Sequence, residues 1–391
     1  ILPPISPPEF PINLSANATW HTFSKFTNAG KGASFSGMSE LKKYFHRFGY
    51  LDNFSDTFSD TFDDKFESAV LKYQKKMGIP VTGRLDSGTV SQIMLPRCGV
   101  SDYITRKHKI IHVSKKYAFF DGEPRWRQTS KTETLMLKYA FSDGHMIDYV
   151  SYSEIRDVFQ RSFGRWASTI PVNFTEVDDY RTADIKIAFY GGDHGDGEPF
   201  DGVLGVLAHA FSPENGRLHF DTAETWAVDF GSTGSNVAID LESVATHEIG
   251  HILGLAHSSV KEAVMYPSLG PRIRKVDLKM DDVKGIQTLY GSNPNFRYTP
   301  SMESDISSGY RPVRAFKQSS SSSIPKSTPS SPKFTIPKTS SPVPRFSFSR
   351  CPSELGCVQS LLPLHNAVAA ARLTSCLSTT SRSCRSLSQG T

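Results

Sequence analysis

The chain has 391 residues, of which 38% are apolar and 26 are Phe, so it can bury more than one core and is not disordered throughout. Its net charge of +5 is uneven, because 12 Lys and Arg stand against 3 Asp and Glu from Ser292 onward. A tail of this charge either contacts acidic polysaccharide or is simply solvated. No run approaches the roughly 20 apolar residues of a membrane-spanning helix, and we expect no nucleic-acid partner.

Four Asn-x-Ser/Thr sequons favour export and glycosylation. They start at Asn13, Asn17, Asn53 and Asn173. The chain begins at Ile1 without a charged and then apolar leader, so we expect that a signal peptide has been removed. The C-terminal sequence "SRSCRSLSQGT" does not support a membrane anchor. The sequence therefore predicts a secreted, extracellular glycoprotein.

The N-terminal part predicts an extended leader and then a small helical bundle. Residues 1–34 are Pro-rich and then polar, which favours an extended leader. Three amphipathic helical patterns follow at 37–50, 63–78 and 86–95. Short helices of this kind pack as a three-helix bundle, which we place within residues 35–114.

Residues 115–291 predict an α+β domain, a mixed sheet with three helices. Strand patterns cover 134–141, 171–177 and 183–190, and helical patterns cover 151–170, 241–253 and 281–291. After Gly291 the periodicity stops, so residues 292–391 predict a Ser/Pro-rich linker and a disordered tail. The tail holds Cys351, Cys357, Cys376 and Cys384, which allow three disulfide pairings.

The stretch "THEIGHILGLAHS", residues 246–258, has the spacing of a metal site. His247 and His251 are four residues apart, so on a helix they lie about 40° apart around the axis and one turn along. Glu248 stands beside the first of them and can take a proton from a metal-bound water. His257 adds a third nitrogen after Gly254, and three nitrogens with one open position favour a catalytic zinc.

The full motif is more specific than its core. A bare HExxH also occurs by chance in helices, whereas HExxHxxGxxH fixes five positions over eleven residues. Met265 follows the third His by eight residues. A second metal pattern lies upstream, where His194, Asp196, His209 and His219 either close a tetrahedral structural zinc site or belong to a polar loop.

The HExxH helix, the turn at Met265 and "PRCGVSD" at 96–102 together resemble the matrixins, the matrix metalloproteinase branch of the metzincins. The wording of "FSGMSELKKYFHRFGYL" and "DLESVATHEIGHILGLAHSS" most resembles the plant members, over about residues 17–295. The resemblance implies a zinc endopeptidase made as a zymogen and secreted to the apoplast or cell-wall matrix. It also implies a monomer that meets protein substrates, proteinaceous inhibitors and activating proteases.

By this resemblance, Cys98 ligates the catalytic zinc as a thiolate and keeps the protein latent, while Arg97 and Asp102 clamp the loop. A thiolate is a strong zinc ligand, and tethering raises its effective concentration. The other interpretation is that Cys98 is simply buried. The sequence departs from the family at Ser101, where most relatives carry Pro, so we expect a less rigid loop.

The resemblance implies further ligands and contacts. The second cluster becomes a structural zinc site, for a total of two zinc ions. At least one Ca²⁺ is implied, held by the carboxylates of Asp201, Asp221 and Glu224 and the carbonyls of Gly202, Leu204 and Val206. Substrate is expected to lie between an edge strand at Ala208 and Ala210 and a wall at Tyr266 and Pro267. An apolar primed-side pocket for Leu-like side chains is expected, left open by Ser243.

Two other classes remain as alternatives to a zinc endopeptidase. One is a catalytically silent protein of the metzincin fold. The other is a glycan-binding protein, because the three-helix region resembles a peptidoglycan-binding bundle. The intact motif at residues 247–257 favours the enzyme.

Overall fold

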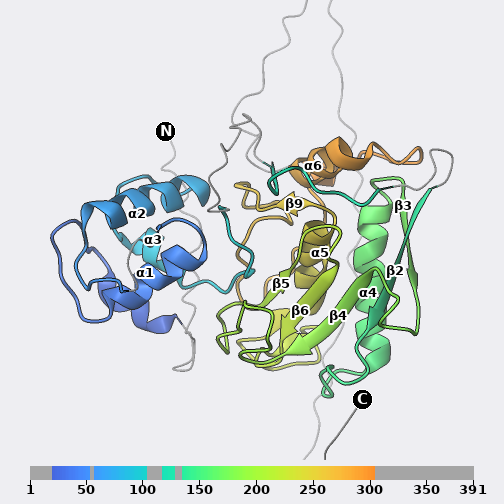
Figure 1. Ribbon diagram of the computed structural model, residues 1–391, viewed down its shortest axis with the longest axis horizontal. Helices are drawn as coiled ribbons and strands as arrows, with labels where there is room; N and C mark the ends of the chain where they lie inside the picture. Colours follow the sequence, from blue (N-terminus) through green and yellow to red (C-terminus); the bar gives the residue numbers. More distant parts are fainter. Residues whose placement is uncertain (1–19, 53–56, 104–116, 128–133, 304–391) are drawn as a thin grey trace, which may run out of the picture. The chain divides into compact units, whose positions relative to one another are not determined.

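The computed structural model describes residues 20–52, 57–103, 117–127 and 134–303 (Figure 1). Within these ranges the chain forms a helical bundle and an α+β domain. The tail after residue 303, three of the four sequons and the four tail cysteines lie outside the described residues, so those predictions stay predictions. The remaining sequon, at Asn173, is exposed on a strand.

Three helices build the bundle at the predicted positions. They are α1 (Met38–Arg47), α2 (Asp64–Lys76) and α3 (Ser87–Ile93). Asp63 and Asp86 cap α2 and α3, because their side chains accept the first free backbone N–H groups of these helices. The apolar faces meet in a core rich in aromatic rings, in which Phe45 packs against both Phe66 and Tyr73.

The described part of the expected leader is not extended. Residues His21–Phe26 form a 3₁₀ helix, η1. Trp20, Phe23 and Phe26 are buried in the bundle core, and Trp20 packs edge-on against Tyr44 with ring centroids 5.0 Å apart. The spacing of three between these aromatic residues puts them on one side of η1. The bundle therefore includes residues that we assigned to the leader of 1–34.

A five-stranded mixed sheet forms the centre of the α+β domain, with the order β3-β2-β4-β6-β5. Its strands are β2 (Leu135–Phe141), β3 (Val172–Glu176), β4 (Ile185–Tyr190), β5 (Ala208–Ala210) and β6 (Arg217–Asp221). All pairs are parallel except β5 with β6, so the mixed sheet is confirmed and β5 is an edge strand. Two small pairs are added, β1 (Ala118–Phe119) with β9 (Leu255–Ala256) and β7 (Trp226–Ala227) with β8 (Ile239–Asp240).

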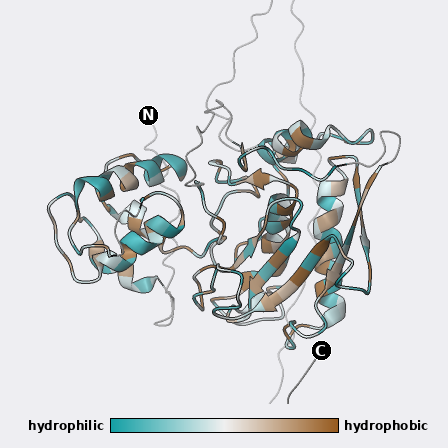
Figure 2. Cartoon of the chain, viewed as in Figure 1, coloured by the Kyte–Doolittle hydropathy of each residue, from teal (hydrophilic) through white to brown (hydrophobic). Residues whose placement is uncertain are grey.

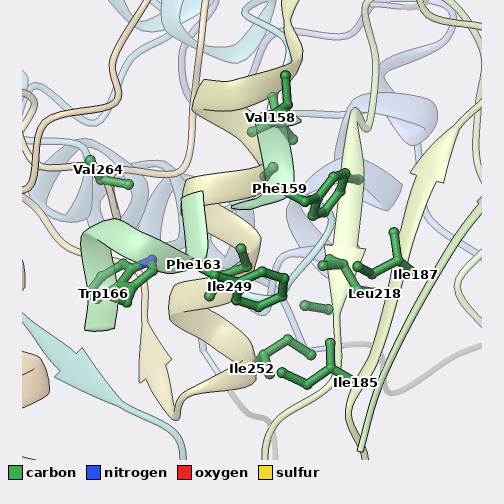
Figure 3. Close-up of a cluster of buried hydrophobic side chains, with 14 of the residues drawn as sticks. Val158, Phe159, Phe163, Trp166, Ile185, Ile187, Leu218, Ile249, Ile252 and Val264 are labelled. Atoms are coloured by element: carbon green, nitrogen blue, oxygen red, sulfur yellow. The ribbon is translucent and has the colours of Figure 1, made fainter. Parts of the chain in front are cut away.

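Helices α4 and α5 pack against each other and against the sheet (Figure 3). The domain's helices are α4 (Tyr152–Ala167), α5 (Leu241–Ile252), α6 (Met280–Tyr290) and the short η2 (Pro300–Met302). Figure 3 shows Phe159 and Phe163 of α4 directed towards Ile249 and the strand residue Leu218. The Trp166 indole donates to the Thr246 carbonyl at 2.9 Å, which fixes α4 against the middle of α5.

Polar and apolar residues mix along the helices and strands, as expected for elements with one buried face (Figure 2). None of the described helices combines the length and the hydropathy that crossing a membrane requires. The α+β class predicted from the sequence is thus confirmed, and α5 is its most deeply buried helix.

Gly250 allows α5 to approach the turn at Met265, and this contact yields a prediction. A methyl group at Gly250 would overlap the Met265 sulfur and lie 3.0 Å from the Trp166 ring. Gly250→Ala should therefore lower the free energy of unfolding by about 1–3 kcal/mol, as overpacked cores do. Chemical denaturation of the full chain measures it.

Gly164→Ala is the matched control, because a methyl group at Gly164 of α4 would meet nothing within 4 Å. This helical Gly→Ala exchange should stabilise by about 0.5–1 kcal/mol. Equal effects of the two substitutions would contradict the close contact at Met265.

Candidate metal centre and active site

Helix α5 begins at a strong cap and stays buried along its length. The Asp240 carboxylate accepts the Ser243 backbone N–H at 2.7 Å and its hydroxyl at 2.5 Å. All twelve residues of the helix, Leu241–Ile252, are buried. The helix ends before Gly254, whose φ of +104° is open to glycine and turns the chain back towards the site.

Three imidazoles converge at the end of α5. The Nε2 atom of His251 lies 3.1 Å from that of His247 and 3.2 Å from that of His257. Each Nδ1 donates to an oxygen: His247 to the Val264 carbonyl at 2.6 Å, His251 to the Leu255 carbonyl at 2.7 Å. Nδ1 of His257 donates to a carboxylate oxygen of Asp102 at 2.7 Å.

These hydrogen bonds select one tautomer. An N–H on Nδ1 leaves each Nε2 with a lone pair that points into the shared space. Burial keeps the rings neutral, since it lowers the pKa of His247 and His251 well below the usual range and that of His257 to about 4. Three lone pairs at this separation repel unless a cation lies between them.

A fourth ligand atom comes from the segment after the bundle. The Cys98 sulfur lies 3.4 Å from Nε2 of His251, and Cys98 is buried. Burial, and then the charge of Glu248, raises the pKa of the Cys98 thiol well above its usual range. A thiolate at this position therefore requires a cation beside it.

The geometry fits zinc. Nitrogens about 2.1 Å from a tetrahedral zinc lie about 3.4 Å apart, and a sulfur at about 2.3 Å lies about 3.6 Å from such a nitrogen. The observed separations of 3.1, 3.2 and 3.4 Å are close to these values. Neutral imidazoles with a thiolate are also the donors that zinc prefers.

Glu248 faces the same space. Neither oxygen of its buried carboxylate accepts a hydrogen bond from a nitrogen or oxygen atom among the described residues. Burial raises its pKa to about 8. Its carboxylate oxygens are acceptors that can take a proton from a neighbouring water. This is the property of a general base placed beside a reacting water.

The turn at Met265 holds the backbone that orients His247. The Met265 backbone N–H and that of Val264 donate to the Asp282 carboxylate at 3.0 and 2.9 Å, which ties the turn to α6. Val264 in turn presents the carbonyl that orients His247. The sequence predicted the turn at Met265 but not Asp282, whose role depends on contacts 17 and 18 residues away.

A second group combines three imidazoles with one carboxylate. An oxygen of Asp196 lies 2.9 Å from Nε2 of His194, 2.8 Å from Nε2 of His209 and 2.9 Å from Nδ1 of His219. Strand register explains part of this, because His209 of β5 pairs directly with His219 of β6. Burial lowers the pKa of His209 and His219 to about 4, so their nitrogens are free to ligate. No position is left open, as in structural zinc sites.

The carboxylates expected to bind calcium do not converge in the same way. Among the described residues, only the two groups above bring three or more His, Cys, Asp or Glu ligand atoms within 4.8 Å. Asp201, Asp221 and Glu224 instead accept backbone N–H groups, at 2.7, 3.3 and 2.7 Å. The donors belong to Val206, Gly202 and Leu204, the residues whose carbonyls we expected as ligands. Burial raises the pKa of Glu224 to about 8.

The segment at Pro96–Gly99 lies between the two expected walls of the substrate site. Gly99 donates its N–H to the Ala208 carbonyl at 2.8 Å, and Cys98 donates to the Pro267 carbonyl at 2.9 Å. Ala210 lies two residues further along β5, opposite Leu218. The segment thus forms backbone bridges to both walls, through Arg97 with Val206 and with Ser268, and uses the kind of backbone pairing by which a peptide binds a sheet edge.

A pocket opens beside Cys98 and Glu248, and its lining includes a basic residue that the sequence did not indicate. Ser243, Tyr266 and Pro267, which we expected to contact substrate, line it, and so does Lys275. Lys275 donates its backbone N–H to the Ser243 hydroxyl at 2.7 Å, and burial lowers the pKa of its amine to about 8. The pocket therefore combines apolar walls with one amine.

Comparison with known proteins shows which family the chain belongs to. Residues 125–291 match the matrixin family model, and residues 36–93 match that of a putative peptidoglycan binding domain. Metalloendoproteinase 1-MMP of Arabidopsis thaliana is 55% identical over 294 residues, 75% of this chain and 79% of that relative. The chain belongs to the matrixin family. As a matrixin it is a zinc metalloendopeptidase, a hydrolase that acts on peptide bonds of proteins.

Other matrixins extend the comparison. Metalloendoproteinase 4-MMP of Arabidopsis thaliana is 57% identical over 268 residues, 68% of this chain and 76% of that relative. Matrilysin of Homo sapiens is 37% identical over 272 residues, 67% of this chain and 90% of that relative. The likeness to plant members that the sequence predicted is confirmed.

The second histidine group yields a prediction about metal content. His219→Ala should remove one of two zinc ions per chain and lower the melting temperature, because an empty site loses its binding energy. Elemental analysis and thermal unfolding measure both. His145→Ala is the control: its ring packs 4.6 Å from that of Tyr190, next to the group but outside it, and it should keep two zinc ions. Two zinc ions in the His219→Ala protein would rule out this ligand set.

Proposed function

We propose that the chain is the secreted, latent precursor of a zinc endopeptidase of extracellular proteins, in which Cys98 holds the catalytic zinc until the propeptide is removed. One observation carries the proposal: the sulfur of Cys98 lies with the Nε2 atoms of His247, His251 and His257 in one buried group. Three nitrogens from the catalytic domain would leave one position of a tetrahedral zinc, which the thiol would fill.

The backbone of the same segment supports latency independently. Residues Pro96–Gly99 bond to β5 on one side and to Pro267 and Leu269 on the other. A substrate peptide would need these same donors and acceptors. The precursor is therefore blocked twice, at the metal and along the substrate cleft.

The mechanism assigns a role to each group of the matured protein. Bound zinc would polarise the scissile carbonyl and lower the pKa of the attacking water. Glu248 takes the proton of that water and passes it to the leaving amine, which balances the hydrolysis. The edge of β5 and the wall at Tyr266 hold the peptide extended, and the pocket at Ser243 and Lys275 receives one side chain.

Outside the catalytic site, the proposal includes further metal ions, glycosylation and protein partners. A second zinc at the Asp196 group and at least one Ca²⁺ near Asp221 stabilise the domain. The calcium is supported by the buried carboxylates of Asp221 and Glu224, which repel each other and the half-buried Asp201. Exposure of Asn173 on β3 is compatible with glycosylation in the secretory pathway. We propose a monomer that meets proteinaceous inhibitors and activating proteases.

Cys98→Ser tests latency. The full-length variant should cleave a quenched peptide without any processing, because a neutral hydroxyl is a far poorer zinc ligand than a thiolate. It should do so more slowly than protein freed of its propeptide, because the backbone bonds of Pro96–Gly99 must still open to admit substrate. Full-length wild-type protein should be nearly inactive until an organomercurial consumes the thiol, and the variant should gain nothing from that treatment. Equal activity of untreated wild type and variant would overturn the proposed latency.

Glu248→Ala tests the mechanism. In protein freed of its propeptide, the substitution should lower kcat/KM by at least ~100-fold, because the general base is lost. Zinc content should stay at the wild-type value, since the three histidines remain. Near-normal cleavage by a variant with full zinc content would exclude Glu248 as the base.

A further inference from the structure

The acceptor for the third histidine does not come from the catalytic domain. His247 and His251 donate to carbonyls of Val264 and Leu255, which follow α5 in the same domain. His257 instead donates to Asp102, 155 residues earlier in the chain and four residues after Cys98. The latent protein therefore completes its metal site with a carboxylate that proteolytic maturation would remove.

Asp102 is held firmly for this contact. One carboxylate oxygen accepts His257 Nδ1–H at 2.7 Å, and the other accepts Arg97 at 2.8 Å and the Tyr50 hydroxyl at 2.7 Å. Asp102, Arg97 and His257 expose none of their side-chain surface, so water does not compete. The Arg97 guanidinium in turn stacks 3.7 Å above the Phe48 ring.

A second bundle residue holds the backbone of His257. The Lys76 amine of α2 donates to the His257 carbonyl at 2.8 Å. Both the ring and the main chain of this histidine are therefore fixed by residues of the bundle and its C-terminal segment. His257 lies beyond the end of α5, so it lacks the helical backbone that positions the other two ligands.

We propose that Asp102 is a positioning residue for His257, so that the latent protein retains zinc more tightly than the matured protein even without counting the thiolate. The inference rests on the proposed zinc site. A carboxylate that accepts the second N–H of a metal-binding histidine fixes its orientation and raises its basicity, and removal of such a partner typically costs about 10- to 100-fold in metal affinity. Removal of the propeptide would then free the coordination position of the Cys98 thiolate and, at the same time, take away the carboxylate that orients His257.

The competing interpretation is that Asp102 acts only as a clamp for the loop through Arg97. In that case its loss would weaken zinc binding only by displacing Cys98. The two interpretations make different predictions for a protein that has no thiol at position 98. If Asp102 only clamps the loop, its loss should then leave zinc binding unchanged, whereas if Asp102 positions His257, its loss should still weaken zinc binding.

The experiment therefore compares full-length Cys98→Ser with Cys98→Ser/Asp102→Ala and Cys98→Ser/Tyr50→Phe. The rate at which each folded, zinc-loaded protein releases zinc to excess chelator is measured, together with the visible spectrum of its cobalt form. Asp102→Ala should speed the release of one zinc per chain by about 10- to 100-fold and shift the cobalt bands. Tyr50→Phe, which removes a hydrogen bond to Asp102 but leaves His257 untouched, should stay near the rate of Cys98→Ser.

Because Asp102→Ala leaves Arg97 buried and unpaired, a second variant guards against misfolding. Arg97→Met/Asp102→Leu replaces the buried ion pair by apolar side chains, an exchange that proteins often tolerate. In the Cys98→Ser background it should also release zinc faster. Equal release rates in Cys98→Ser and both Asp102 variants would overturn the inference alone. A wild-type chain with no zinc at the three histidines would overturn the proposed function and the inference with it.

Discussion

Four buried ligand atoms at one point are the constraint on which the rest of this structure depends. Three neutral imidazoles and one thiol without a cation would be a costly cluster of repelling lone pairs in a space that excludes water. With zinc, the same cluster joins parts of the chain that are more than a hundred residues apart. The burial of α5, the turn at Met265 and the path of the segment at Pro96–Gly99 all serve to bring those atoms together.

The bundle and the catalytic domain share more than the metal. Phe200, Val206 and Tyr266 of the catalytic domain belong to the same apolar cluster as the bundle's aromatic residues. The Tyr266 hydroxyl donates to the Met77 carbonyl, and the Gln92 amide donates to the Ser268 hydroxyl. One wall of the proposed substrate cleft is thus covered by the bundle, so the proposed latency would depend on a whole interface as well as on one thiol.

Local patterns explain what the sequence could predict. The spacing of four between His247 and His251 is a property of one helix, and the amphipathic patterns of α1, α2, α4 and α6 each describe a single buried face. The residues alone left the convergence of His194 and His219 open against a polar loop, and the family resemblance favoured it, because the convergence depends on strand register and on a loop. The three-residue strand β5 is too short for any periodicity to indicate it.

The sequence was least informative where contacts are long-range and individually weak. Nothing in the run "RCGVSD" indicates that Asp102 accepts a hydrogen bond from His257. Likewise, nothing in the sequence near Lys275 indicates that this residue lines the pocket. Trp20, Phe23 and Phe26 were hidden by the Pro-rich composition before them, so the bundle starts earlier than expected. The carboxylates near Asp221 are a different case. The family resemblance implied that they bind calcium, but their oxygen atoms do not converge on one point in the structure.

The central claim is that the thiolate of Cys98 is bound to zinc in the precursor. X-ray absorption at the zinc edge of the full-length, unprocessed protein tests it without relying on activity. The account predicts one sulfur neighbour at about 2.3 Å for every two zinc ions, with nitrogen and oxygen neighbours otherwise, and loss of that sulfur signal in Cys98→Ser. A spectrum of the wild-type precursor fitted by nitrogen and oxygen neighbours alone would contradict it.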